Sequence, residues 1–311
     1  MRRARWVLFA YHTIGARALE ALVACGEQIA AVVTHADEPG EARWFESVAE
    51  VARIHRIPCL TPTSPNRPEI VDAVRRLAPD LLLSVWYRRL LGPKLLALPR
   101  VAALNLHGSL LPAYRGRAPL NWVLVNGETR TGVTLHHMTA VADAGDMVAQ
   151  RSIDIEADDT ASTLYDRMTK IGVDLLLETY PAVLAGAAPR IRQDDTRATT
   201  MPRRGPEDGR IEWAWPAARI FNMIRAVAEP YPGAFVGDGR ARVRLWAASL
   251  LDTSADGIAP GTLLDIVPPR GIAVATGRGV LLITRIQGAG GVAEPAHRWA
   301  ARRALRPGAR L

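Results

Sequence analysis

Short apolar runs separated by stretches of helical period make up the first third of the chain. The runs are solidly apolar and only a few residues long, which is typical of strands buried on both faces. They fall at residues 6–10, 29–34, 58–60, 81–85 and 101–106. Apolar side chains recur at helical spacing in residues 15–25, 46–55 and 68–77. This alternation predicts an α/β fold with a Rossmann-like parallel sheet, which binds ligands beyond the carboxyl ends of its strands.

The pattern changes in the second half of the chain. Residues 160–184 have a helical period, and residues 194–210 are polar and rich in Arg, Pro and Gly, which is typical of a linker. Beyond a helix at 217–227, β-type runs separated by glycines predict a small β-barrel of the oligonucleotide-binding (OB) class. We therefore expect an α/β domain over residues 1–203 and an OB-like domain over residues 204–311.

Composition narrows the class of protein. Of 311 residues, 49% are hydrophobic, so the chain is long and apolar enough for a full core. Its formal net charge of +8 arises largely near the two ends, which permits nucleic acid as a partner but does not require it. Only Cys25 and Cys59 occur, without zinc-ligand or disulfide spacing, which fits a reducing compartment. No apolar run approaches the roughly 18 to 20 residues that cross a bilayer, so we expect a cytoplasmic protein without membrane insertion.

The stretch from Ala103 to Pro119 carries the strongest chemical signal. Successive side chains of a strand point to opposite faces, so Asn105 and His107 lie on the same side at the carboxyl end of the strand at 101–106. An amide that donates hydrogen bonds, beside an imidazole that passes a proton, is typical of an acyl-transfer centre. A purely structural hydrogen-bonding role is the alternative for these two residues.

A second polar cluster follows an alternating strand at 133–137. Asp143 lies in the turn-forming sequence Asp-Ala-Gly-Asp, and we expect it to return to His107, orient the imidazole and raise its pKa. Capping of the turn is the alternative for Asp143. His136 and His137 are neighbours on the strand and point to opposite faces, so we expect both to be structural and expect no metal.

The first turn of the expected sheet argues against a nicotinamide cofactor. The segment Ala10-Tyr-His-Thr-Ile-Gly15 has one glycine where the dinucleotide fingerprint has three, and no phosphate-binding Walker sequence occurs in the chain. We therefore expect a Rossmann-like sheet that does not bind a dinucleotide.

Four segments together resemble the 10-formyltetrahydrofolate-dependent formyltransferase family. They are Asn-Leu-His-Gly-Ser-Leu-Leu-Pro at 105–112, Tyr-Arg-Gly-Arg-Ala-Pro at 114–119, Gly-Val-Thr-Leu at 132–135 and Asp-Ala-Gly-Asp at 143–146. Further segments, beginning with Phe-Ala-Tyr-His at 9–12, are similar to the branch of the family that formylates UDP-4-amino-4-deoxy-L-arabinose for lipid A modification and polymyxin resistance. The resemblance runs from about Trp6 to the end of the chain.

The resemblance implies a reaction and a set of site residues. The amino group of an amino sugar attacks the formyl carbon of 10-formyltetrahydrofolate, Asn105 and His107 stabilise the resulting oxyanion, and Asp143 orients His107. Arg204 is the first candidate for binding the uridine diphosphate, and Arg115 is the second. The resemblance assigns folate binding to Arg89, Leu90, Leu91, Arg117, Thr139, Ala140, Val141, Ala142 and Asp143.

Other acceptors and one other class of protein stay open. Methionyl-tRNA formyltransferase is the main alternative, but acidic residues at Asp37 to Glu41 stand where that family carries a basic loop, and they would repel a phosphate backbone. We therefore expect no nucleic-acid partner. A dTDP-linked amino sugar is another alternative. A noncatalytic folate or nucleotide sensor is the third, although such a protein would not need Asn105, His107 and Asp143 together.

Two departures from the family pattern stand out. Trp86 occurs near the folate-binding strand, where the family usually has Phe or Tyr. The related bifunctional enzyme also carries a decarboxylating dehydrogenase domain, and we expect that activity on a separate protein here. Without that domain we expect no large oligomer, and a homodimer stays open.

Overall fold

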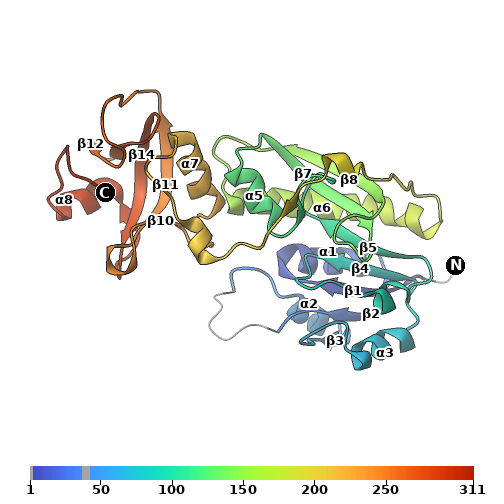
Figure 1. Ribbon diagram of the computed structural model, residues 1–311. Helices are drawn as coiled ribbons and strands as arrows, with labels where there is room; N and C mark the ends of the chain where they lie inside the picture. Colours follow the sequence, from blue (N-terminus) through green and yellow to red (C-terminus); the bar gives the residue numbers. More distant parts are fainter. Residues whose placement is uncertain (1–2, 37–42) are drawn as a thin grey trace. The chain divides into compact units, whose positions relative to one another are not determined.

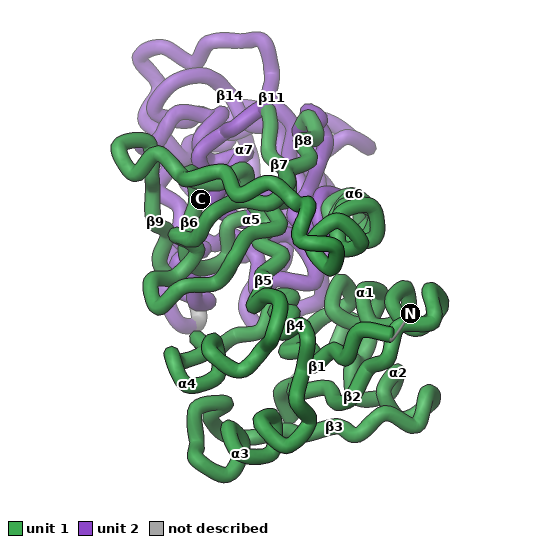
Figure 2. The backbone as a smooth tube through the Cα atoms, turned by 90° about the vertical axis from the view of Figure 1, so that its right-hand side faces the viewer, with its two compact units in different colours: residues 1–119, 130–154, 166–202 green, residues 120–129, 155–165, 203–311 purple. Residues whose placement is uncertain are grey.

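The computed structural model describes residues 3–36 and 43–311. They form two compact units, coloured separately in Figure 2. Unit 1 contains residues 1–119, 130–154 and 166–202, and unit 2 contains residues 120–129, 155–165 and 203–311. The segments 120–129 and 155–165 thus belong to the C-terminal unit, although the sequence-based division placed them in the catalytic domain. Asn121 illustrates the reason, because its Nδ2 donates to the carbonyl oxygen of Ala226 at 2.8 Å.

Unit 1 is built on a seven-stranded sheet with the strand order β3-β2-β1-β4-β5-β7-β8 (Figure 1). The first five strands of this order run parallel, and β7 and β8 are antiparallel to their neighbours. The strands are β1 (Arg5–Ala10), β2 (Gln28–Val33), β3 (Cys59–Leu60), β4 (Leu81–Val85), β5 (Ala102–His107), β7 (Arg130–His137) and β8 (Met147–Asp154). The predicted Rossmann-like sheet is confirmed.

Burial explains why the central strands are apolar without alternation. Every residue of β4 is buried, as are Trp6 to Ala10 of β1, because helices cover both faces of a parallel sheet. The helices of this half of the chain are α1 (His12–Ala24), α2 (Val48–Ile54), α3 (Pro68–Arg76), α4 (Pro93–Leu96), α5 (Pro119–Val125) and α6 (Ala161–Leu184). The long helix α6 packs closely on the sheet, since a Cβ atom on Gly172 would lie 3.3 Å from Leu106 and 3.2 Å from Ile14 of α1.

Unit 2 contains a six-stranded antiparallel sheet with the order β10-β11-β14-β13-β12, and β15 pairs with β14. Its core includes Leu245, Leu263, Ile272 and Leu281, which are fully buried. The predicted second, all-β part of the fold is therefore confirmed as an antiparallel sheet. The elements of this unit are α7 (Ala217–Ala226), β10 (Ala234–Val236), β11 (Val243–Leu251), β12 (Leu263–Val267), β13 (Gly271–Ala275), β14 (Val280–Gly288), β15 (Glu294–Pro295) and α8 (Ala296–Arg302).

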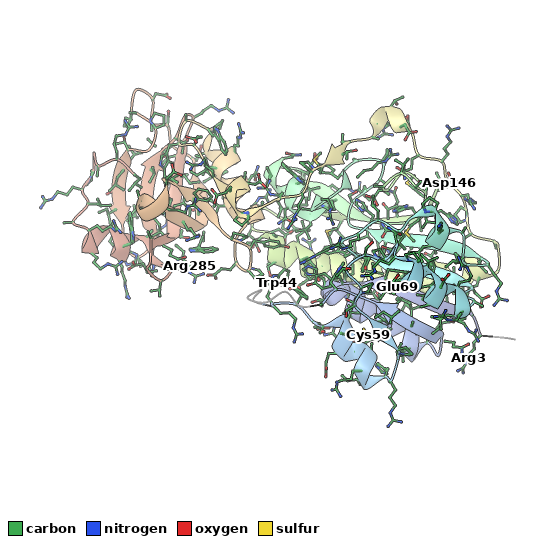
Figure 3. The ribbon with its side chains drawn as sticks, turned by 60° about the horizontal axis from the view of Figure 1, so that its bottom comes forward. Arg3, Trp44, Cys59, Glu69, Asp146 and Arg285 are labelled. Atoms are coloured by element: carbon green, nitrogen blue, oxygen red, sulfur yellow. The ribbon has the colours of Figure 1, made fainter. Side chains whose placement is uncertain are left out.

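The two cysteines are exposed and form no disulfide; Cys59 is labelled in Figure 3. Among the described residues, no helix combines the length and the apolar character needed to cross a membrane. The same part of the chain has no cluster of three or more His, Cys, Asp or Glu side chains arranged to hold a metal ion. The acidic residues Asp37 to Glu41, which weighed against a tRNA acceptor, lie outside the described residues.

Candidate active site

The site is built where β5 ends beside the antiparallel strand β7. Asn105 and His107 lie two positions apart on β5, and Asn105 is directly opposite His136 of β7. The chain that follows β7 brings Asp143 back to both β5 side chains. The structure thus places the three predicted catalytic side chains together, and it adds His136, for which we expected only a structural role.

His107 is buried and fixed from one side of its ring. Its Nε2 lies 2.8 Å from the carbonyl oxygen of Tyr114, which can only accept, so Nε2 carries a hydrogen and donates it. The other ring nitrogen, Nδ1, lies 3.5 Å from Oδ1 of Asp143. Proton exchange by this histidine is therefore restricted to Nδ1, next to a carboxylate.

Asp143 is held as a carboxylate by several donors. The backbone N–H of Gly116 donates to its Oδ2 at 2.8 Å, and Nδ2 of Asn105 donates to its Oδ1 at 3.2 Å. Burial alone would raise the pKa of Asp143, but the neighbouring His107 and His136 and the Gly116 N–H outweigh burial and hold the pKa well below its usual range. Asp143 is therefore ionised at neutral pH.

Both amide hydrogens of Asn105 have partners within the site. Nδ1 of His136 donates to the carbonyl oxygen of His137 at 2.8 Å, so in the neutral ring Nε2 is the acceptor, and it lies 3.0 Å from Nδ2 of Asn105. The second hydrogen points to Asp143. For Asn105 to donate to a formyl oxygen, one of these two bonds has to be exchanged, and the bond to Asp143 is the longer.

The pKa of His107 differs from the sequence-based expectation. We expected Asp143 to raise it, but burial of the imidazole lowers the pKa more than Asp143 and the Tyr114 carbonyl raise it, so the pKa lies below the ordinary histidine value. The nearby His136 lowers it further. At neutral pH, His107 is consequently a neutral base with its lone pair on Nδ1.

Apart from Arg117, the residues that the resemblance assigned to folate lie on two loops of unit 1. In the first, Arg89 and Leu90 are exposed, whereas Leu91 is buried in a core cluster with Tyr87 and Leu95. In the second, Val141 is 65% exposed, which nearly equals the 66% of Leu90. The remaining residues of the second loop, Thr139, Ala140 and Ala142, are exposed or half-buried.

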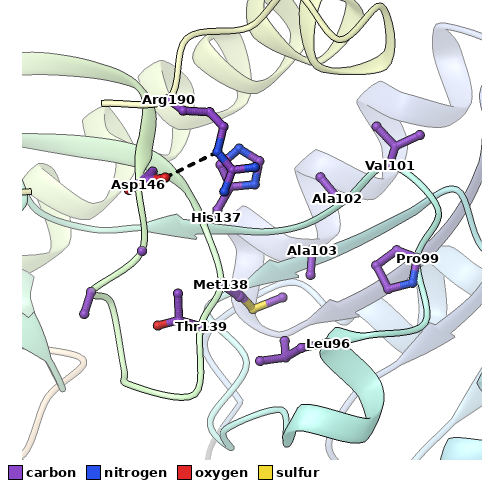
Figure 4. A pocket seen from close by; sticks show the side chains of 12 residues that line it. Leu96, Pro99, Val101, Ala102, Ala103, His137, Met138, Thr139, Asp146 and Arg190 are labelled. Carbon is purple, nitrogen blue, oxygen red and sulfur yellow. Dashed lines mark hydrogen bonds and ion pairs between the residues drawn. The ribbon is translucent and has the colours of Figure 1, made fainter. Parts of the chain in front are cut away.

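A pocket of about 300 Å³ opens beside the second loop (Figure 4). Its apolar wall includes Leu96, Ala103 and Met138, and Thr139 lies at the start of the loop. The charged wall has one ion pair, in which Nε of Arg190 lies 3.3 Å from Oδ2 of Asp146.

Three of the four candidate ligand-binding arginines have different surroundings. Arg117 is exposed directly after the Gly116 N–H that binds Asp143. Arg115 is buried, and its guanidinium donates to Oε1 of Gln193 at 2.7 Å and to Oδ1 of Asp195 at 2.7 Å. In unit 2, Arg204 donates to the carbonyl oxygen of Asp208 and stacks over the ring of Trp122 at 4.6 Å. Binding of a nucleotide by Arg115 or Arg204 stays a prediction.

Aromatic side chains lie next to the residue that follows His107. A Cβ atom on Gly108, the residue after His107, would lie 3.1 Å from Cζ2 of Trp86, so the indole lies against this backbone. The ring of Trp86 is 6.2 Å from that of His12, which in turn is 5.4 Å from the ring of Trp44. Trp44, labelled in Figure 3, is 37% exposed. We call Trp86, His12 and Trp44 the aromatic wall.

Comparison with known families gives the class of protein. A family model described as formyl transferase matches residues 9–180, and a second, described as formyl transferase, C-terminal domain, matches residues 204–304. The chain belongs to the formyl transferase family. Asn105, His107 and Asp143 all lie within the first matched region.

Solved structures share the fold of this chain at low sequence identity. HypX from Aquifex aeolicus in complex with tetrahydrofolic acid has a TM-score of 0.65 at 18% identity, over 97% of this chain and 47% of that one, so the chain spans about half the length of HypX. An N-formyltransferase from Helicobacter canadensis, in complex with folinic acid and dTDP-3-aminofucose, has a TM-score of 0.67 at 16% identity, over 91% and 99%. Methionyl-tRNA formyltransferase from Clostridium thermocellum has a TM-score of 0.58 at 19% identity, over 81% and 95%.

Proposed function

We propose that this protein transfers the formyl group of 10-formyltetrahydrofolate to the 4-amino group of UDP-4-amino-4-deoxy-L-arabinose. The observation that carries the proposal is the convergence of Asn105, His107 and Asp143 at one strand end in a chain of the formyl transferase family. The acceptor rests on the segments that resemble the formyltransferase part of the bifunctional polymyxin-resistance protein ArnA. A role in lipid A modification in the cytoplasm follows from that acceptor.

The two loops assigned to folate have the chemistry of a binding site for a flat aromatic ring. Leu90 and Val141 each leave most of a large apolar side chain in water, so each can contribute apolar contact area to a bound ring. The pocket beside Thr139 offers an apolar wall together with the carboxylate of Asp146, which can accept hydrogen bonds from the amino and ring N–H groups of a pterin. The folate would therefore lie against these loops, and the cationic side chains of Arg89 and Arg117 are the candidates for binding its carboxylates.

The aromatic wall fits an amino-sugar nucleotide as acceptor. Aromatic faces pack against the apolar faces of pyranose rings and nucleobases, and Trp86 lies against the residue that follows His107. The Helicobacter canadensis N-formyltransferase, which has the same fold, was solved with dTDP-3-aminofucose bound. An acceptor of this kind needs no tRNA-sized surface for binding.

The reaction follows from the protonation states. The acceptor nitrogen forms a bond to the formyl carbon while Nδ1 of neutral His107 takes its proton, and the Asp143 carboxylate stabilises the imidazolium. Asn105 donates to the oxyanion of the tetrahedral intermediate. When the bond between the formyl carbon and N10 breaks, the proton passes from His107 to N10, which yields tetrahydrofolate and the formamide and returns His107 to its neutral state.

A direct assay separates this acceptor from its rivals. The purified chain is incubated with 10-formyltetrahydrofolate and either UDP-4-amino-4-deoxy-L-arabinose, a dTDP-linked amino sugar or methionyl-tRNA, which the net charge of +8 would favour. Tetrahydrofolate release and the mass of the acceptor are followed together. We expect the highest kcat/KM for the UDP sugar. Turnover on methionyl-tRNA alone, or on the dTDP sugar alone, would replace the proposed acceptor, and no turnover on any of them would reject the function.

A further inference from the structure

The backbone of the Asp143 loop is in an unusual conformation that something must hold. Asp143 has a φ of +54°, in the left-handed region that residues with a Cβ rarely adopt. Two residues on, a Cβ atom on Gly145 would lie 1.9 Å from the carbonyl oxygen of His137, so the loop is pressed against the end of β7. The carboxylate position that His107 requires thus depends on contacts that fix this backbone.

Gln193 makes those contacts from a distant part of the chain. Its Nε2 donates to the carbonyl oxygens of Asp143 and Gly145, at 2.7 Å each, across sequence separations of 50 and 48 residues. Both amide hydrogens are therefore used on the loop. Only 5% of Gln193 is exposed, so in this environment the two bonds have no competition from water.

The acceptor end of the same amide is also satisfied. Nε and an Nη of Arg115 both donate to Oε1 of Gln193, at 3.1 and 2.7 Å, and Arg115 is in turn anchored to Asp195. Gln193 thus binds the backbone of Asp143 and also Arg115. The residue after Arg115 is Gly116, whose N–H binds the carboxylate of Asp143.

The segment that carries Gln193 is itself fixed to the sheet. Ile191 and Met147 exchange two backbone hydrogen bonds of 2.8 Å, which attaches this segment to the start of β8. Arg190 adds the ion pair with Asp146, drawn as a dashed line in Figure 4. The backbone next to Gln193 is therefore fixed where the loop meets β8, so the side chain of Gln193 can define the position of the loop.

We propose that Gln193 is a positioning residue for formyl transfer: it holds the Asp143 carboxylate beside Nδ1 of His107 through two hydrogen bonds to the loop backbone. This inference rests on the proposed function. Gln193 touches neither substrate nor reacting atoms, so it acts through Asp143. Its removal is expected to reduce kcat. In Gln193→Glu, which keeps the acceptor for Arg115, the KM for the acceptor should stay at the wild-type value.

Two substitutions separate positioning from plain structural support. Gln193→Glu keeps the size of the side chain and the acceptor for Arg115 but has no hydrogens to donate to the loop. Gln193→Met removes both the donor and the acceptor of the amide without adding charge. The matched control is Gln287→Met in unit 2, because Gln287 also bridges two groups, accepting from Nε1 of Trp246 at 2.9 Å and donating to the Gly291 carbonyl at 2.7 Å.

The first readout is kcat. We expect both Gln193 variants to lose about 100-fold, the scale of a displacement of about 1 Å at a catalytic group, and the Gln287 control to keep wild-type kcat. Wild-type kcat in a folded Gln193→Glu enzyme would overturn the proposal, since the donated bonds would then be dispensable.

The second readout does not depend on turnover and so distinguishes this inference from the proposed function. The C2 proton of His107, assigned by its absence in His107→Gln, is titrated by NMR in the wild type and in Gln193→Met. Asp143 and His136 are the titratable groups that face His107. Displacing the Asp143 carboxylate removes the attraction of a negative charge, so we expect the midpoint to fall in Gln193→Met and to stay constant in Gln287→Met. If the titration midpoint of His107 is unchanged in Gln193→Met, Gln193 does not position Asp143. If the midpoint falls but the wild-type protein formylates none of the acceptors, the proposed function is wrong and the positioning role of Gln193 still holds.

Discussion

Nε2 of His107 donates a hydrogen bond to the carbonyl oxygen of Tyr114 at 2.8 Å, and this bond decides which nitrogen takes part in chemistry. With Nε2 committed to a backbone acceptor, only Nδ1 can exchange protons, and Nδ1 is the atom that faces Asp143. A neutral base with a fixed tautomer and an adjacent carboxylate is suited to deprotonate an amine during acyl transfer.

The protonation state of His107 is directly measurable. Because burial outweighs the attraction of Asp143, we expect its NMR titration midpoint to lie below 6.5. Asp143→Asn removes the one group that contributes a negative charge, so the midpoint should fall further in that variant. A midpoint above 6.5 in the wild-type protein would mean that His107 is cationic near neutral pH and cannot be the base.

Asp143→Asn should also reduce catalysis more than its small change in size suggests. Asparagine can still accept from the Gly116 N–H, so the loop is retained, but the imidazolium loses its counter-ion. We expect kcat to fall by about 100-fold or more. Asp80→Asn is the control, since Asp80 binds the Arg5 N–H far from the site along β1, and should change stability but not kcat. Equal kcat in the two variants would remove Asp143 from the mechanism.

The folate surface is tested by the two exposed apolar residues. Leu90→Ser and Val141→Ser each remove apolar contact area worth roughly 1 to 2 kcal/mol, which corresponds to an increase of about 5-fold to 30-fold in the KM for 10-formyltetrahydrofolate. The KM for the acceptor should not change. Val292→Ser provides the comparison, because Val292 is 79% exposed in unit 2. If Leu90→Ser and Val141→Ser change the KM for 10-formyltetrahydrofolate no more than Val292→Ser does, this placement of the folate is wrong.

For the aromatic wall we expect the opposite result, a change in the KM for the acceptor and not in the KM for the donor. Trp86→Ala removes an aromatic surface beside Gly108, and stacking on an aromatic side chain is worth roughly 1 to 3 kcal/mol per ring. The KM for the sugar nucleotide should rise about 5-fold to 150-fold while the donor KM stays constant. Steady-state kinetics with each substrate varied in turn measure the split. If the donor KM alone rises, Trp86 belongs to the folate surface.

Acid should destabilise the fold through His12. Burial, followed by Arg88 and His35, lowers the pKa of His12 to about 3, whereas an unfolded histidine titrates near 6.5. Between these values the unfolded chain binds a proton that the folded chain does not, so the free energy of unfolding falls as pH falls, by about 1.4 kcal/mol per pH unit for this group. In His12→Gln, denaturant unfolding from pH 6.5 to pH 4 should show a shallower slope. If the free energy of unfolding depends on pH equally steeply in His12→Gln and in the wild type, His12 is not the group that titrates.

The local pattern of apolar and polar residues was sufficient to predict much of the fold and part of the site. The solidly apolar β4 was predicted at its observed bounds, Leu81–Val85, because a strand buried on both faces has no polar positions to confuse the pattern. Asn105 and His107 follow from strand alternation alone. β8 was missed because its edge position leaves Gln150 and Asp154 exposed, so its residues are neither solidly apolar nor regularly alternating.

Long-range contacts account for what the sequence did not reveal. His136 was expected to be structural, and only the antiparallel register of β5 with β7 places it opposite Asn105. Arg115 was selected as a charge for nucleotide binding, yet its guanidinium binds Gln193, which is 78 residues away along the chain. No local periodicity contains such a pairing, since both residues lie in irregular or very short elements.

Formyl transfer by the wild type and by a variant without the His107 imidazole shows whether this histidine is the base. Formyl transfer from 10-formyltetrahydrofolate to UDP-4-amino-4-deoxy-L-arabinose is measured for the wild-type protein and for His107→Ala under identical conditions, with the folded state of both confirmed. We expect the wild type to formylate the sugar nucleotide and His107→Ala to lose about 100-fold to 1,000-fold in kcat. Turnover that survives His107→Ala would contradict the proposed active site, and a wild-type protein that formylates methionyl-tRNA but not the sugar nucleotide would contradict the proposed acceptor.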